Sequence, residues 1–124
     1  MRIYAAEWNS RHIVAVHVGD YIRYAELREI ASRLEEYDEV LAKADVVILS
    51  GKMPSWYSLG LLATILKKYQ PSVIGIYRPP ADKVLVVYSE DEYLPVNTWL
   101  ELTKKLREFC RSGVIFLEDT PKHA

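Results

Sequence analysis

An unbroken run of four apolar residues, Val46-Val47-Ile48-Leu49, constrains the fold of this chain more than any other feature. Three of the four are β-branched, and such a run is typical of a strand that is covered on both faces. Gly51 follows, and because it lacks a Cβ atom it lets the backbone turn or approach a ligand closely. Pro54 and Ser55 then suit the first turn of a helix. The stretch Asp45–Trp56 therefore predicts a strand, a short loop and a helix start.

Strands and helices alternate along the rest of the chain. Alternating or continuous apolar runs predict further strands: Arg2–Trp8, His12–Val18, Val73–Tyr77, Val84–Tyr88 and Val114–Leu117. Apolar residues at helical spacing predict helices: Tyr24–Ala42, Ser55–Lys68 and Val96–Cys110. Short connections make hairpins of the first two strands and of the fourth and fifth. The order β-β-α-β-α-β-β-α-β predicts a single α/β domain over residues 1–124, with a mixed sheet and helices on both faces.

The composition excludes several classes of protein. The 124 residues carry a formal net charge of −1, which argues against a double-stranded DNA-binding protein that relies on many phosphate contacts. Cys110 is the only cysteine, so an internal disulfide is excluded and a Cys/His metal cluster is not expected. No apolar run reaches membrane length and no signal segment is evident, so we expect a cytoplasmic protein. Few Asn and Gln residues among abundant Glu, Lys, Arg and Tyr are typical of a thermophile.

The two histidines of the second predicted strand do not form a metal site. His12 and His17 are five positions apart, so a regular strand directs them to opposite faces. We expect each to be a surface or interface residue, and we predict no metal and no cofactor.

The carboxyl ends of two predicted strands carry cationic residues. No Walker pattern, GxGxxG or GxSxG occurs, but Lys52 and Arg78 each follow a strand, and both lie on one rim if those strands are parallel. Together with a helix N-terminus they would form a small anion pocket. Trp56 and Tyr57 border it, and aromatic faces stack on bases, which points to a nucleotide. The alternatives are an ordinary βα loop, surface charge and core aromatics.

The helix Ser55–Lys68 is apolar on nearly all sides until its last two residues. Such a helix must be buried on more than one side. A subunit interface in a homodimer or homotetramer would supply the second side; the alternative is that both sides are covered within one monomer.

The segments VVILSGKMPSW and VIGIYRPPADKVLVVYS, within Val46–Ser89, resemble a small family of stand-alone ring nucleases of type III CRISPR systems, distantly related to the CARF domain. The family pattern is a strand ending Ser-Gly-basic-x-Pro-x-Trp, a helix, a strand ending Tyr-Asp-Pro, and a valine-rich strand. The resemblance implies a CARF-like fold that binds cyclic oligoadenylate, most simply the tetramer ring, between subunits. Taken together with the anion pocket, it gives as candidate ligand-binding residues Ser50, Gly51, Lys52, Met53, Pro54, Trp56, Tyr57, Arg78 and Pro79.

The metal-dependent branch of this family has His, Asp and His where this sequence has Ser58, Arg78 and Glu90. Metal catalysis is therefore not carried over. One option is metal-independent cleavage, in which a ribose 2′-OH attacks the adjacent phosphate in line. In that option Lys52 and Arg78 would stabilise charge while Ser50 and Ser58 position the hydroxyl. The second option is binding alone. Outside this family, the alternatives are an oligomerising adaptor without a nucleotide ligand and an enzyme that acts on a small molecule or linear RNA.

Overall fold

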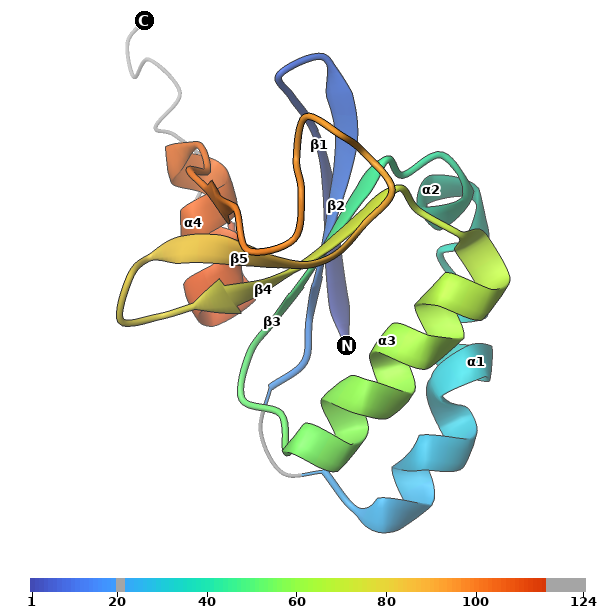
Figure 1. The fold of residues 1–124 in the computed structure, drawn as a ribbon. Helices are drawn as coiled ribbons and strands as arrows, with labels where there is room; N and C mark the ends of the chain where they lie inside the picture. Colours follow the sequence, from blue (N-terminus) through green and yellow to red (C-terminus); the bar gives the residue numbers. More distant parts are fainter. Residues whose placement is uncertain (20–21, 116–124) are drawn as a thin grey trace, which may run out of the picture.

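The computed structural model describes residues 1–19 and 22–115, and its centre is an open six-stranded sheet (Figure 1). The strands lie in the sheet in the same order as in the chain. They are β1 (Arg2–Trp8), β2 (Arg11–His17), β3 (Val46–Ser50), β4 (Val73–Arg78), β5 (Lys83–Ser89) and β6 (Trp99–Leu100).

The sheet is mixed, as expected from the sequence. The strands β2, β3 and β4 are parallel to one another, whereas β1 runs antiparallel to β2, β5 to β4 and β6 to β5. The predicted hairpins β1–β2 and β4–β5 are confirmed. All five residues of β3 are buried, and both of its neighbours are parallel strands. The continuous apolar run was therefore a correct signal for the central strand.

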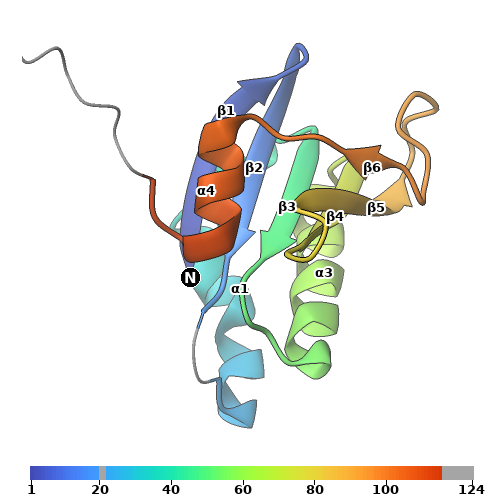
Figure 2. The same cartoon turned by 90° about the vertical axis from the view of Figure 1, so that its left-hand side faces the viewer.

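Helices cover both faces of the sheet (Figure 2). One face packs on α4, which contacts β1, β2 and β3, and the other carries α1 and α3. The helical segments are η1 (Tyr24–Glu29, a 3-10 helix), α1 (Ile30–Glu35), α2 (Asp38–Ala42), α3 (Ser55–Tyr69) and α4 (Lys104–Ser112). No helix within the described ranges is both long and apolar enough to cross a membrane.

The prediction of one continuous helix over Tyr24–Ala42 is wrong. The segment divides into η1, α1 and α2, and the break between α1 and α2 falls at Tyr37, whose φ of −119° is not helical. None of the residues of η1 is buried, so packing constrains this segment less than it constrains α1. The buried positions Ile30, Leu34 and Leu41 do follow the expected spacing.

The prediction of a helix over Val96–Cys110 is also wrong in its first half. Asn97 has a φ of +77°, which an α-helix does not accept, and Trp99 and Leu100 pair with β5 as the short strand β6. The helix α4 begins only after Thr103, whose side chain accepts a hydrogen bond from the Leu106 N–H at 3.4 Å. The last predicted strand, Val114–Leu117, does not form at residues 114 and 115, and the remainder lies outside the described residues.

Candidate anion-binding rim

The parallel strands β3 and β4 bring Lys52 and Arg78 to the same edge of the sheet. The register of this pair ends with Leu49 opposite Ile76, and the chain leaves β3 after Ser50 and β4 after Arg78. Both cationic side chains are exposed. The geometric condition set by the sequence, two cations on one rim, is therefore met. We call this edge, with the residues that follow β2, β3 and β4, the carboxyl rim.

Both cations belong to the α3 side of the carboxyl rim. Ile74 is in the core on this side of the sheet, and alternation along β4 places Ile76 and Arg78 on the same face. Lys52 lies in the loop that enters α3. Among the described residues, no acidic group pairs with Lys52 or Arg78. The charge of Lys52, three residues before α3 begins at Ser55, therefore adds to that of the helix N-terminus.

The loop between β3 and α3 is fixed by close backbone packing. Gly51 has a φ of +102°, and a Cβ atom on it would lie 1.8 Å from the Val18 carbonyl oxygen. The Val18 N–H donates to the Ser50 carbonyl at 2.9 Å. Of the other predicted loop residues, Met53 and Pro54 are half-buried, whereas Pro79 is exposed in the β4–β5 turn. Only glycine fits at position 51, so this backbone path is specified by the sequence.

One of the two predicted aromatic residues belongs to the core. Tyr57 is 3% exposed, and burial raises the pKa of its hydroxyl. Trp56 is half-buried and lies against Tyr24, with ring centroids 4.7 Å apart. Tyr24 is 75% exposed. The aromatic surface near the start of α3 is thus Trp56 and Tyr24, and no local sequence pattern points to Tyr24, because it comes from η1.

The hydroxyl groups of Ser50 and Ser58 are both engaged within the protein. Ser50 is 2% exposed, and its Oγ lies 3.0 Å from Nδ1 of His17. The Ser58 hydroxyl donates to the Ser55 carbonyl at 2.9 Å. The expectation that His17 lies on the surface is wrong, because it is 8% exposed; its strand ends beneath α4.

The buried pair of His17 and Ser50 extends to Cys110 of α4. Burial raises the pKa of the Cys110 thiol to about 12, against the lowering effect of a hydrogen bond with Ser50. The His17 ring lies edge-on to Phe109 at 5.9 Å, and a Cβ on Gly113 would come within 2.5 Å of the imidazole. These residues are far apart in sequence, so no local pattern could have brought them together.

The β4–β5 turn, which carries Arg78 and Pro79, is tied to α4 through Asp82. The Tyr77 hydroxyl donates to Asp82, and Arg111 binds the same carboxylate at 3.2 Å. Burial, then the hydrogen bond to Asp82, raises the pKa of Tyr77 to about 12. The turn therefore has a fixed position relative to α4, and so does Arg78.

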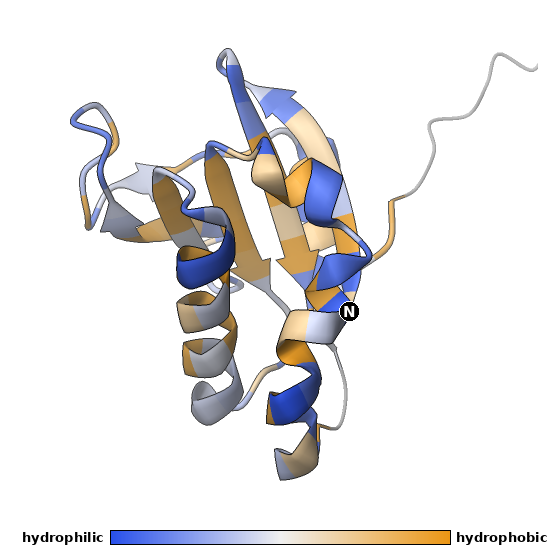
Figure 3. Cartoon of the chain, turned by 90° about the vertical axis from the view of Figure 1, so that its right-hand side faces the viewer, coloured by the Kyte–Doolittle hydropathy of each residue, from blue (hydrophilic) through white to orange (hydrophobic). Residues whose placement is uncertain are grey.

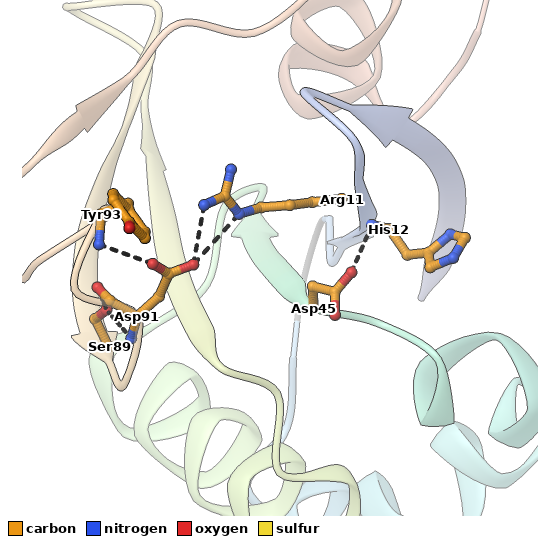
Figure 4. Close-up of polar contacts among 6 residues, drawn as sticks. All are labelled: Arg11, His12, Asp45, Ser89, Asp91 and Tyr93. Atoms are coloured by element: carbon orange, nitrogen blue, oxygen red, sulfur yellow. Dashed lines mark hydrogen bonds and ion pairs between the residues drawn. The ribbon is translucent and has the colours of Figure 1, made fainter.

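The opposite edge of the sheet has charges that pair internally (Figure 4). Arg11 donates to Asp91 through Nε at 3.3 Å and Nη2 at 3.1 Å, and Asp91 also accepts from the Tyr93 N–H at 2.8 Å. The Asp45 carboxylate accepts from the His12 N–H at 2.8 Å. We call this edge the amino rim, and its polar contacts connect the start of β2 to the chain that follows β5.

A metal centre is not built by the described residues, since no three His, Cys, Asp or Glu side chains there are grouped to hold an ion. Neither a scan against protein-family models nor a search of curated proteins finds a match to this sequence. The candidate site therefore has to be judged on its own geometry.

Proposed function

We propose that this chain binds a cyclic oligoadenylate on the α3 side of the carboxyl rim. The observation that carries the proposal is that Lys52 and Arg78 follow neighbouring parallel strands and have no acidic partner among the described residues. Phosphate groups are the natural counterpart of two such cations beside a helix N-terminus. Adenine rings have an aromatic partner close by in Tyr24 and Trp56.

A cyclic ligand suits a site that two copies of the chain share. One copy presents one rim, and a ring with two-fold symmetry is matched by the same rim repeated across a two-fold axis. The outer side of α3 offers a contact for this pairing, because Leu59 is 67% exposed and hydrophilic residues gather only in the last turn of the helix (Figure 3). Trp99 on β6 is 47% exposed, and its partner Leu85 on β5 shares its face of the sheet. The dimer is part of the proposal.

The resemblance of Val46–Ser89 to CARF-like ring nucleases supports the same ligand. By this analogy the chain is an accessory protein of type III CRISPR immunity with a CARF-like fold. The analogy extends to the ligand and the rim, and it does not extend to a metal, because Ser58, Arg78 and Glu90 replace the ligands of the metal-dependent branch.

Binding is favoured over cleavage by the two serines. Ser50 is buried with its hydroxyl facing His17, so it does not reach a ligand, and the Ser58 hydroxyl donates its proton within its own helix and could only accept from a ribose 2′-OH. Cleavage would then depend mainly on Lys52, Arg78 and backbone N–H groups. We therefore propose a binding protein, and ring cleavage without a metal is the second candidate.

Calorimetric titration with cyclic tetra-adenylate tests the proposal. We expect Lys52→Ala and Arg78→Ala each to weaken binding by about 1–3 kcal/mol, the loss typical of a hydrogen bond to a charged group. The matched control is Lys67→Ala, which removes an exposed lysine from the other end of α3 and should leave the affinity unchanged. Product analysis of labelled ring incubated with and without Mn²⁺ distinguishes binding from cleavage.

Two results would contradict the proposal. One is an absence of binding heat with the tetramer and hexamer rings, and the other is equal affinity in all three variants. If light scattering then shows oligomers that no nucleotide affects, the exposed side of α3 is better explained by an adaptor that assembles without a nucleotide ligand.

A further inference from the structure

The strand β1 forms a long edge of the sheet and has one open side (Figure 2). Its seven residues pair with β2 in an unbroken register from Arg2↔His17 to Trp8↔Arg11. Among the described residues, no strand lies on its other side. The opposite edge is β6, which has only two residues. An edge as long as β1 is a template for another strand.

The hairpin fixes which backbone groups of β1 point outward. Asn9 and Ser10 have φ values of +48° and +64°, so they form a two-residue turn of type I′, which makes Trp8↔Arg11 a hydrogen-bonded pair. Hydrogen-bonded and non-hydrogen-bonded pairs then alternate along the ladder. The N–H and C=O groups of Ile3, Ala5 and Glu7 therefore point away from β2.

Contacts on the far side of β2 give the same result. The His12 N–H donates to the Asp45 carboxylate at 2.8 Å, and the His12 carbonyl accepts from the Asp45 N–H at 2.8 Å. His12 therefore faces β3, and its neighbours Arg11 and Ile13 face β1. Since Ile13 pairs with Ala6, Ala6 faces β2 and Ala5 faces outward.

This edge lacks most of the features that usually keep edge strands apart, and its two charged residues, Arg2 and Glu7, lie towards its ends. Proteins protect such edges with proline, bulges or charged side chains. The strand β1 has no proline, its register shows no bulge, and its four central residues, Ile3–Ala6, are uncharged. A hollow of about 330 Å³ also lies beside the strand, on the side of α2. Its lining includes Ala5, Val14, Val40 and Lys43.

We propose that β1 pairs antiparallel with β1 of a second copy, with the two-fold axis at Ala5. A two-fold axis must place one residue opposite itself, and only Ala5 as the centre uses all three outward-facing residues. Ile3 then lies opposite Glu7 of the partner subunit, so no like charges face each other, whereas an axis at Glu7 would oppose two carboxylates. Each of these pairs exchanges two backbone hydrogen bonds.

The pairing closes on itself, because each copy uses its single long edge. It is separate from the proposed contact through α3, because the free edge of β1 and the outer side of α3 are formed by different residues. A chain that uses both surfaces would assemble beyond a dimer. A second copy is the favoured occupant because β1 is complementary to itself. The uncharged centre of one strand meets the uncharged centre of the other, and each outward-facing residue has a partner.

Sedimentation velocity on a chain carrying Leu59→Glu tests the β1 contact alone, because that substitution places a charge on the outer side of α3. We expect a dimer in this background. Adding Ala5→Pro should raise the dimer dissociation constant at least about tenfold, since proline removes an outward N–H while the bonds to β2 remain. The matched control is Ala5→Val, which keeps the N–H and should remain dimeric.

Amide exchange provides a second readout that does not depend on proline being tolerated. Protection of the Ile3, Ala5 and Glu7 amides should rise with protein concentration in the Leu59→Glu chain. A monomer at every concentration, or a dimer that Ala5→Pro leaves unchanged, would overturn the proposal. So would protection of these three amides that is independent of concentration, because the occupant of the edge would then belong to the same chain.

Discussion

Arg11 and Asp91 at the amino rim and the two cations of the carboxyl rim, Lys52 and Arg78, are charged residues in opposite circumstances. At the amino rim, Arg11 and Asp91 satisfy each other, and Asp45 binds the backbone of His12. At the carboxyl rim, Lys52 and Arg78 are exposed and have no acidic partner within the described ranges. Charges that are paired inside a chain stabilise its fold, whereas unpaired charges held by a rigid backbone are available to a ligand.

The backbone of the carboxyl rim is held by contacts of its own. Gly51 contacts the Val18 carbonyl, and Asp82 fastens the β4–β5 turn to Arg111 of α4. The contrast between the rims is therefore one of charge pairing and not of rigidity, and substitutions can test each half of it.

The largest effect is expected at Gly51. Gly51→Ala would place a Cβ atom 1.8 Å from a backbone oxygen at a φ of +102°, so we expect it to cost more than about 3 kcal/mol of unfolding free energy, measured by urea denaturation. Gly19→Ala is the control, because its Cβ would meet only His17 side-chain atoms at 3.6 Å or more. Equal stability of the two variants would show that the loop between β3 and α3 can shift to accept a Cβ atom. The claim that close packing holds this loop in place would then be wrong.

Breaking the charge pairing of the amino rim should have an intermediate effect. The Tyr93 N–H and then the Arg11 guanidinium hold the pKa of Asp91 below its usual range. Its contribution to stability is present above the unfolded-state value of about 3.9 and is lost as the pH falls through the lower folded-state value. Asp91→Asn should therefore lower the midpoint of urea denaturation at pH 7. Below about pH 4, the midpoint of this variant should fall less steeply with pH than that of the unmodified chain.

The matched substitutions at the other rim are Lys52→Ala and Arg78→Ala. We expect each to change the unfolding free energy by less than about 0.5 kcal/mol, as is usual for surface positions. If they destabilise the chain as much as Asp91→Asn does, the two rims do not differ in the way described.

The smallest effect is expected at Tyr77. The pKa of its hydroxyl is raised to about 12. Its contribution to folding stability is therefore complete below the unfolded-state pKa of about 10 and is lost as the pH rises from there towards 12. Tyr77→Phe should remove only part of the loss of stability between pH 9 and 11. The pKa of Tyr69 is raised as well, so Tyr69 causes a loss of its own over this range. A pH profile identical to that of the unmodified chain would mean that the bond to Asp82 does not matter for the turn.

Local sequence patterns predicted the centre of the molecule well. The run Val46–Leu49 located the central strand, and the two short connections located the hairpins, because burial on both faces and tight turns leave direct traces in residue type. The parallel pairing of β3 with β4, which the sequence left open, places the ends of these two strands at the same edge of the sheet.

Patterns failed where tertiary contacts decide. Val96, Trp99 and Leu100 have helical spacing, yet Asn97 turns the chain and β5 captures the next residues as β6. The contact of His17 with Ser50, and the place of Tyr24 beside Trp56, join elements that are distant in sequence. Such pairs leave no periodic signal, so the polar part of the rim could be predicted only for the residues that directly follow a strand.

The buried thiol beneath α4 gives the chain an internal reporter. Cys110 is the sole cysteine, is 1% exposed and has a pKa of about 12, so an alkylating reagent at neutral pH reaches it only when α4 lifts from the sheet. The rate of alkylation thus measures how often the layer formed by α4 opens, in an unlabelled and unmutated protein.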